Sequence, residues 1–375
     1  MRKSLGSILF SSLKRIGKAQ QRQQKKLVKS LSTVVKRASK PAIPVLPAKT
    51  AKPKALKPRV QPLPPALAAP LAGSWTRSFF AVPGGPRMAY WLYLPPRNKL
   101  ALQPPLPLVV MLHGCGQTAP DFAQGTRMNA LAQRKGFAVL YPQQLLTTDA
   151  NRCWQWYRSA TQQGGGDAAS VVGLLAHVVG KQGLDATRVY LAGLSAGAAL
   201  AEVIALRYPH FIAAVGMHSG PVFGMADNRL AAFAVMQHGA LQGGEPAVQA
   251  LASDPGFPGM PAMLLHGDAD KVVRPVNLHQ VARQFCLLNH LPATHVPVTT
   301  RQPARSGGRS PRHALERLDY RLGRKTLVSV CRIAGLDHAW SGGDAALRFN
   351  SKLGPDASAL LWAFFEKHRR PDRIR

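Results

Sequence analysis

The sequence predicts an α/β fold in which a mostly parallel β-sheet carries helices on both faces. Two observations support this fold class. Short apolar runs of strand length alternate with helical segments from residue 106 onward, and such alternation is typical of parallel sheets that are buried on both sides. One apolar run also leads directly into Gly193-Leu-Ser195-Ala-Gly197, after which an alanine-rich helical segment begins.

The expected elements follow one another along the chain. The strands are short and mostly apolar, and they cover residues 106–112, 137–141, 189–192, 213–218, 262–266 and 327–333. The helical segments cover residues 122–135, 170–180 and 198–206, and a further helix is expected near the C-terminus. In such sheets, reactive groups gather at the carboxyl ends of the strands. The loops after these strands are therefore where a functional site is expected.

Composition divides the chain before this α/β domain. The first acidic residue is Asp121, and residues 1–60 hold 17 of the 49 Lys and Arg residues. We expect a basic amphipathic or disordered segment at 1–40, a Pro/Ala/Lys-rich linker at 41–74 and one domain at 75–370, which is long enough for a single core. The formal charge of +32 is thus concentrated toward the N-terminus.

Apolar residues in the N-terminal segment recur at helical spacing, at Leu5, Ile8, Leu9, Leu13 and Ile16. A basic amphipathic helix would suit an anionic or apolar surface, such as a granule or a membrane. A disordered basic arm is the alternative on composition. Nucleic acid is electrostatically feasible, but it is not favoured, because Phe10 is the segment's one aromatic residue and no recognition module follows it.

The segment makes a weak secretion signal. Its apolar run is interrupted by Gly6, Ser7, Ser11 and Ser12, and no small-residue cleavage site follows. No stretch of the chain reaches the 18 or so continuous apolar residues of a membrane-spanning helix.

Ser195 lies in the pattern strand, G-x-S-x-G, helix, which is that of a nucleophile elbow. Gly193 and Gly197 lack the Cβ atoms that would clash in so tight a turn. The turn would present the Ser195 hydroxyl above the sheet and direct the Ala196 amide at the place where an oxyanion forms. The motif therefore predicts a catalytic serine, with a plain strand-to-helix turn as the alternative.

A serine hydroxyl needs a base that takes its proton and a third group that orients the base. In elbow folds the chain order is Ser, then Asp or Glu, then His. Asp270 follows the strand at 262–266 and has a better reach than its competitor Asp268, which we interpret as a turn cap. His338 follows the strand at 327–333 in a glycine-flanked loop and is the candidate base, whereas His368 lies in a charged tail.

Three further strands end in histidine, at His113, His218 and His266. We interpret these residues as structural, because the first precedes the nucleophile and the others lack the late glycine-rich loop. The loop that contains His113 is placed to supply the second oxyanion donor, the amide of Cys115, beside the amide of Ala196. A cysteine nucleophile at Cys115 is disfavoured, since no cysteine elbow accompanies it.

The four cysteines are Cys115, Cys153, Cys286 and Cys331, and none has the C-x-x-C spacing of a zinc site. Cys115 and Cys153 both lie beside candidate active-site segments. Whether these two, or Cys286 and Cys331, form disulfides is left open by spacing alone. No cofactor or metal is implied, because serine hydrolysis carries its own nucleophile.

Several ordered segments of this chain resemble one family. They are His113-Gly-Cys115, Gln117, Asn151-Arg-Cys-Trp-Gln-Trp156, Ala192-Gly-Leu-Ser-Ala-Gly197, His218-Ser-Gly220, His266-Gly-Asp-Ala-Asp270 and His338-Ala-Trp-Ser-Gly-Gly343. In this order they look like the short-chain polyhydroxyalkanoate (polyhydroxybutyrate, PHB) depolymerase and esterase family, whose relatives include feruloyl and acetylxylan esterases. The resemblance covers about residues 75–368.

The resemblance implies an α/β-hydrolase fold, a Ser195–Asp270–His338 triad and an oxyanion loop at Cys115. Members of the family are commonly secreted, which implies an extracellular location. The weak signal leaves a cytoplasmic or granule-associated location as the alternative. Two positions depart from the family's pattern and could alter the pocket. Gly116 stands where threonine is common, and Asp337 stands where glycine is usual.

The expected activity is that of a serine esterase that hydrolyses PHB or its oligomers through an acyl-enzyme on Ser195. The expected partner is thus a polyester or a small ester. Trp154, Trp156, Trp340 and Gln117 are candidate substrate-binding residues, because exposed indoles would offer apolar area, with core packing as the alternative for each tryptophan. A feruloyl or acetylxylan esterase is the first alternative function. A surface- or granule-binding protein, in which the basic tail is the main function, is the second.

Overall fold

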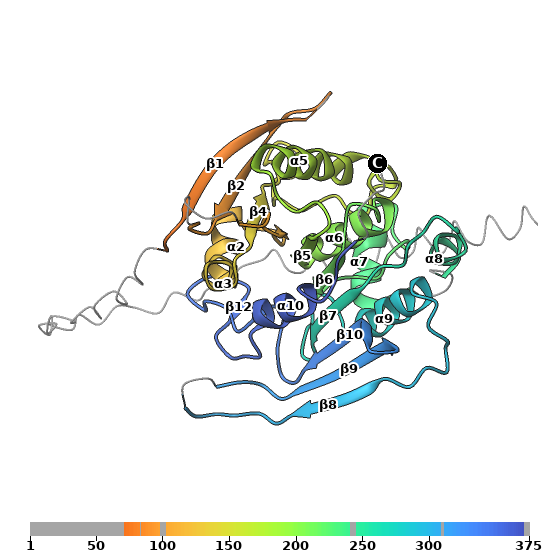
Figure 1. Ribbon diagram of the computed structural model, residues 1–375. Coiled ribbons are helices and arrows are strands. Elements are labelled where there is room, and N and C mark those ends of the chain that lie inside the picture. Colours follow the sequence, from red (N-terminus) through yellow and green to blue (C-terminus); the bar gives the residue numbers. More distant parts are fainter. Residues whose placement is uncertain (1–70, 83, 98–102, 241–244, 309–310, 371–375) are drawn as a thin grey trace, which may run out of the picture. The chain divides into compact units, whose positions relative to one another are not determined.

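The computed structural model describes residues 71–370, apart from 83, 98–102, 241–244 and 309–310. The predicted segment at 1–40 and the linker at 41–74, except its last four residues, lie outside the described residues. The described residues build a ten-stranded sheet in the order β1-β2-β4-β3-β5-β6-β7-β10-β9-β8 (Figure 1). From β4 to β10 neighbouring strands are parallel, whereas the strands at both ends pair antiparallel. The predicted α/β fold with a mostly parallel central sheet is confirmed.

The parallel strands coincide with the apolar runs of the sequence. They are β3 (Leu108–Leu112), β4 (Ala138–Pro142), β5 (Val189–Leu194), β6 (Ala214–His218), β7 (Ala262–Gly267) and β10 (Lys325–Ile333). Every residue of β3 to β7 is buried. Their sequences read as continuous apolar runs because helices cover both faces of the sheet.

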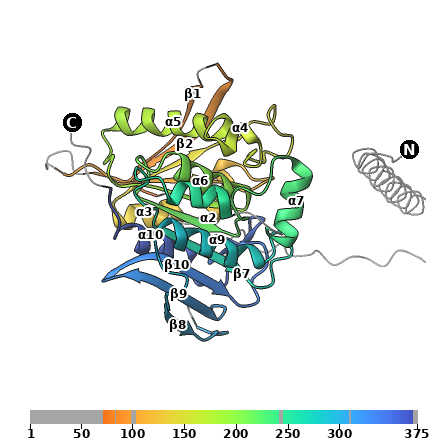
Figure 2. The same ribbon diagram turned by 90° about the vertical axis from the view of Figure 1, so that its right-hand side faces the viewer.

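Two hydrophobic cores lie on the two faces of the sheet, and successive strand residues alternate between them. On β3, Val110 and Leu112 face one core, and Val109 and Met111 face the other. The first core is closed mainly by α5 (Gly166–Gln182), α6 (Ala196–Arg207) and α9 (Val276–Leu288). The second is closed by α2 (Ala119–Thr126), α3 (Met128–Lys135) and α10 (Ala357–Phe365) (Figure 2).

The sequence predicted one helix at 122–135, but the structure has two. Arg127 lies between α2 and α3 with a left-handed φ of 55°. Its amide bonds to the carbonyl of Gln124 and ends the first helix. Arginine gives no sequence signal for a left-handed residue, so the break was not foreseen.

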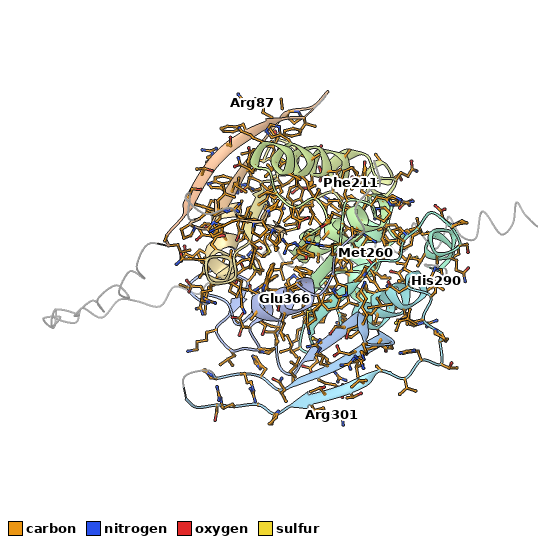
Figure 3. All side chains as sticks on the ribbon, in the orientation of Figure 1. Arg87, Phe211, Met260, His290, Arg301 and Glu366 are labelled. Atoms are coloured by element: carbon orange, nitrogen blue, oxygen red, sulfur yellow. A yellow bond between two sulfur atoms is a disulfide. The ribbon has the colours of Figure 1, made fainter. Side chains whose placement is uncertain are left out.

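Antiparallel strands extend the sheet at both ends. They are β1 (Ser74–Ala81) and β2 (Arg87–Leu94) at one end, and β8 (Val298–Gln302) and β9 (Leu315–Leu322) at the other. Arg87 and Arg301 mark these two ends (Figure 3). All five residues of β8 are exposed, so this strand has no apolar pattern that the sequence analysis could detect.

The smaller elements lie around the loops at the carboxyl ends of the strands or complete the first core. They are α4 (Ser159–Gln162), α7 (Arg229–His238), α8 (Glu245–Ala252), β11 (Trp340–Ser341) and β12 (Asn350–Ser351). Within the described ranges, no helix is both long and apolar enough to span a bilayer.

Candidate active site

Ser195 follows β5 in a strained backbone conformation, with φ 57° and ψ −120°. Few non-glycine residues adopt such angles, and strain of this kind is often found at functional sites. A Cβ atom at Gly193 would overlap the backbone of Gly197, and one at Gly197 would overlap the carbonyl oxygen of Leu112. The two glycines therefore let β5, α6 and β3 approach one another closely enough to form the turn.

Asp270 and His338 meet at the carboxyl ends of two adjacent parallel strands, β7 and β10. His338 Nδ1 lies 2.7 Å from Asp270 Oδ2. The other carboxylate oxygen accepts the amides of Val272 and Val273, each at 2.9 Å. The carboxylate is therefore fixed from both sides, and it orients the imidazole with Nδ1 as the donor and Nε2 as the free acceptor.

The surroundings of Asp270 favour its charged form. Burial by itself would raise the pKa of this carboxyl group. The hydrogen bond and charge of His338, together with the amide of Val273, outweigh that effect and lower the pKa below its usual range. Asp270 can thus stabilise a positive charge that develops on His338.

Asp268, the competing aspartate, takes part in a different contact. It is exposed, and its Oδ1 accepts the amide of Gly335 at 2.7 Å. This bond holds the beginning of the loop that carries His338. The structure therefore brings Asp270, and not Asp268, to the imidazole, as the sequence analysis favoured.

Two amides near Ser195 are placed to bind an oxyanion. Ala196 is the first residue of α6, so its N–H has no acceptor within the helix. Within the described part of the chain, the amide of Cys115 donates to no other group. The Cys115 loop lies beside the serine, since a Cβ atom on Gly114 would be 3.7 Å from that of Ser195.

The oxyanion loop is tied to the segment that follows β4. A disulfide joins Cys115 to Cys153, with their Cα atoms 4.3 Å apart. Gly116 donates its amide to the carbonyl of Asn151 at 2.6 Å. The pairing that the sequence left open is therefore Cys115 with Cys153, whereas Cys286 and Cys331 are free thiols.

Gln117 lies inside the oxyanion loop. Its side chain is buried, and its Oε1 accepts the amide of Gly114 at 2.8 Å. This side chain closes the oxyanion loop on itself, and its role in substrate binding stays a prediction. When a short turn directs some of its amides at a ligand, its remaining N–H group needs an acceptor within the turn. Here the Gly114 amide is that group and Gln117 Oε1 is its acceptor.

The prediction that three tryptophans offer exposed indole surface is wrong. Trp154, Trp156 and Trp340 are each 4% exposed or less. Trp154 donates its Nε1–H to the carbonyl of His113, and Trp340 donates to Ser358 and stacks on His218. Each indole thus packs in the core, where burial of its large apolar area stabilises the fold. The N–H groups of Trp154 and Trp340 each have a hydrogen-bond acceptor there.

The three strand-end histidines are buried, as their structural interpretation requires. Burial lowers the pKa of His113 to about 4 and that of His218 to about 3. His113 Nε2 accepts the amide of Gln144, and His266 Nε2 donates to the carbonyl of Val273. Neutral imidazoles therefore connect the loops around the site.

Two aspartates that the sequence analysis missed, the buried Asp149 and the half-buried Asp167, organise the loop after β4. Asp149 accepts the amides of Asn151 and Cys153, at 2.9 Å and 3.2 Å. Asp167 accepts the amide of Gln155 and the side chain of Gln144, both at 2.7 Å, and burial raises its pKa. The available signal was a cluster of polar residues directly after a buried strand.

Exposed apolar side chains follow three of the parallel strands, and we call this set the apolar rim. Its members are large apolar side chains at least 38% exposed, on the loops and helices that follow β4, β6 and β7: Leu146, Leu230, Phe233, Val272 and Val276. Contacts near both ends hold α7, which carries Leu230 and Phe233, in place. Arg229 pairs with Asp149 at 2.8 Å, and Gln237 donates to the carbonyl of Val272 at 3.0 Å.

The described residues contain no group of three or more His, Cys, Asp or Glu side chains that could hold a metal ion. The groups gathered at this edge are a strained serine, an oriented imidazole and two amides. Such an arrangement can perform nucleophilic attack on an acyl group.

Comparison with known proteins agrees with this geometry. Residues 88–302 match the family described as Esterase PHB depolymerase. Poly(3-hydroxyalkanoate) depolymerase C of Paucimonas lemoignei is 32% identical over 185 residues, which cover 48% of this chain and 44% of that protein. Feruloyl esterase B of Neurospora crassa is 36% identical over 132 residues, or 35% of this chain and 43% of that protein. The chain thus spans under half the length of these two relatives.

A similar fold occurs in the solved structure of acetyl xylan esterase from Aspergillus awamori. The TM-score is 0.58 at 21% sequence identity, and the match covers 71% of this chain and 94% of that one. This likeness concerns the arrangement of the sheet and its helices.

Proposed function

The chain belongs to the esterase family of PHB depolymerases, and from this premise we propose that it is a serine esterase that cleaves short-chain polyhydroxyalkanoate, or its oligomers, through an acyl-enzyme on Ser195. The observation that carries the proposal is the 2.7 Å contact between His338 and Asp270. It occurs at the same sheet edge as the strained Ser195. A nucleophile, a base and its orienting carboxylate are the parts that acyl transfer requires.

The proposed reaction has two halves. His338 Nε2 takes the proton of Ser195, and the serine oxygen attacks the ester carbonyl. The amides of Ala196 and Cys115 stabilise the oxyanion. The alcohol leaves with the proton from His338, and water activated by the same imidazole then releases the acid from Ser195. Asp270 holds His338 in the required tautomer throughout.

The apolar rim supports a polyester over a sugar ester. Leu230 is 79% exposed and Phe233 is 58% exposed on α7. Apolar side chains at the edge of an active site suit an insoluble, apolar polymer, whereas a carbohydrate needs many hydrogen-bond partners. The named relatives include esterases of both kinds, and the rim is the observation that favours a polyester in this proposal.

Substrate profiling of the purified protein tests this proposal. We expect turnover of PHB particles and of 3-hydroxybutyrate oligomers at kcat/KM at least tenfold above that for methyl ferulate and acetylated xylan. A preference for feruloyl or acetyl sugar esters would favour the carbohydrate-esterase alternative. Absence of turnover on all of these esters, and on a short p-nitrophenyl ester, would remove the esterase proposal.

We also propose that the basic segment at 1–40 is a targeting device, joined by the linker at 41–74 to the esterase domain at 75–370. The absence of acidic residues before Asp121 supports attraction to an anionic surface, and the helical spacing of apolar residues supports contact with an apolar one. Deleting residues 1–70 should abolish binding to PHB granules or anionic vesicles while leaving turnover of soluble esters unchanged. Retained surface binding would refute this role, and lost turnover would show that the segment serves catalysis.

An extracellular location is part of the proposal. The Cys115–Cys153 disulfide supports it, because such bonds persist mainly in oxidising compartments. Detecting the protein in the culture medium of its source, with this bond intact, is the corresponding test. Recovery only from the cell interior would favour the cytoplasmic or granule-associated alternative.

A further inference from the structure

His218 contacts both the nucleophile and the loop of the proposed base. It ends β6, which lies between β5 and β7 in the sheet. Its carbonyl oxygen accepts the amide of Ser195 at 2.9 Å. Its ring nitrogen Nε2 accepts the amide of Ser341, three residues after His338, at 3.3 Å. One residue thus connects two parts of the site that come from distant segments of the chain.

These contacts fix the state of the His218 ring. An amide can only donate, so Nε2 must be the acceptor, and the proton lies on Nδ1, which is 3.1 Å from Ser219 Oγ. The ring is fully buried and stacks on Trp340, with ring centroids 5.3 Å apart. Burial also lowers the pKa of His218 to about 3, which keeps the imidazole neutral over the working range of an esterase.

The other amides of the base-bearing loop bind elsewhere. Trp340 donates its amide to Phe349, and Gly342 donates to Leu353, both in the segment before α10. Ser341, between them, is the residue whose amide reaches the central sheet through His218. Loss of the Nε2 acceptor would therefore leave the loop attached to the C-terminal segment and to Asp268 and Asp270, but would release it from β6, the strand next to Ser195.

We propose that His218 is a positioning residue that sets the separation between Ser195 Oγ and His338 Nε2. Its backbone holds the elbow, and its imidazole holds the loop of the base. This inference rests on the proposed esterase function. Proton transfer requires the base within hydrogen-bond reach of the hydroxyl, and a misplacement of about 1 Å can cost roughly 100-fold in rate.

Two substitutions of His218 in the full-length protein distinguish the effect of the Nε2 acceptor from the effect of the aromatic ring. His218→Phe keeps an aromatic ring against Trp340 but removes the acceptor. His218→Gln replaces the ring with an amide whose Oε1 can reach the Ser341 N–H group. On p-nitrophenyl butyrate, kcat should fall about 100-fold in the Phe variant with KM unchanged, and the Gln variant should stay within about tenfold of wild type. His177→Phe, the same substitution at an exposed histidine of α5, is the control and should keep wild-type kcat.

Thermal unfolding confirms that each variant is folded at the assay temperature. If His218→Phe does not fold, His218→Asn takes its place, because its side chain is too short to reach Ser341, and the same loss of kcat is expected. Wild-type kcat in the variant without an acceptor, or an equal loss in the Gln variant, would overturn the positioning role while leaving Ser195 as the nucleophile. An inert wild-type enzyme would instead overturn the proposed function, and this inference with it.

Discussion

Asp268 and Asp270, two residues apart in one turn, bind different parts of the loop that carries His338. Asp270 Oδ2 lies 2.7 Å from the imidazole Nδ1, and Asp268 Oδ1 accepts the amide of Gly335 at 2.7 Å. The first contact sets the tautomer of the base, and the second holds the loop that brings the base to the site. We therefore expect replacement of each aspartate by asparagine to have different effects on kcat.

Asp270→Asn should lower kcat for a p-nitrophenyl ester by about 10³- to 10⁴-fold, because a neutral amide neither selects the tautomer nor stabilises the imidazolium. Asp268→Asn is the matched control. Its amide oxygen can still accept from Gly335, so its kcat should stay within about threefold of wild type. Steady-state kinetics on both variants checks this. An equal loss in the two variants would contradict the assigned pairing.

The Cys115–Cys153 disulfide closes a loop with a sequence separation of 38 residues. In the chain-entropy view, a loop of this length corresponds to about 4 kcal/mol of stability. Reduction should therefore lower the free energy of unfolding by up to this amount. It should also lower kcat, because the Cys115 amide belongs to the proposed oxyanion hole.

Urea unfolding and esterase assays with and without a phosphine reductant measure both effects. Cys153→Ser should show the same losses without reductant, and Cys286→Ser should behave like wild type, since Cys286 is a free thiol. Unchanged kcat in a protein whose disulfide is fully reduced would show that the oxyanion loop does not need this bond.

The apolar rim predicts a selective effect on polymer hydrolysis. Leu230→Ser combined with Phe233→Ser should reduce the hydrolysis of PHB film at least tenfold, because burying each side chain contributes about 1.5–3 kcal/mol. Turnover of p-nitrophenyl butyrate should be unchanged. Val296→Ser is the control, since Val296 is 84% exposed and precedes β8 at the opposite, amino-terminal edge. Equal losses on film and soluble ester would mean that α7 does not bind polymer.

Buried histidines predict that the fold loses stability in acid. The pKa is lowered to about 4 for His113 and to about 3 for His218, whereas an unfolded histidine takes up its proton at about pH 6.5. Below about pH 6.5 the unfolded chain thus binds more protons than the folded one, and stability falls with pH. At pH 5 the loss should be about 2 kcal/mol for each of the two groups.

Urea unfolding at pH 8 and at pH 5 checks this prediction. His218→Gln provides the control, because it removes one of the two titrating groups and should reduce the pH-dependent loss by about 2 kcal/mol. A free energy of unfolding that is the same at both pH values would show that these imidazoles are not buried in the neutral form.

Much of the fold could be predicted because its signals are local. The strands from β3 to β7 are continuous apolar runs, and the elbow at Ser195 needs glycines that are visible in the sequence. Asp270 and His338 were found because the chain order of such a site is fixed. These inferences needed no knowledge of which side chains meet across the fold.

The features that the sequence did not reveal depend on contacts between distant residues. Trp154 donates its indole N–H to the carbonyl of His113, 41 residues earlier, and Trp340 stacks on His218. Both indoles are therefore buried. Tryptophan is common both in cores and at binding sites. The role of His218 depends likewise on Ser341, 123 residues later in the chain. Only the packed structure shows which partner each of these residues has.

The central claim is that Ser195 is the nucleophile of an esterase. Turnover of p-nitrophenyl butyrate by Ser195→Ala, compared with wild type under identical conditions, tests it most directly. The site predicts a loss of kcat of about 10⁴-fold or more in a variant with an unchanged unfolding transition. A folded Ser195→Ala protein that keeps wild-type turnover would contradict it.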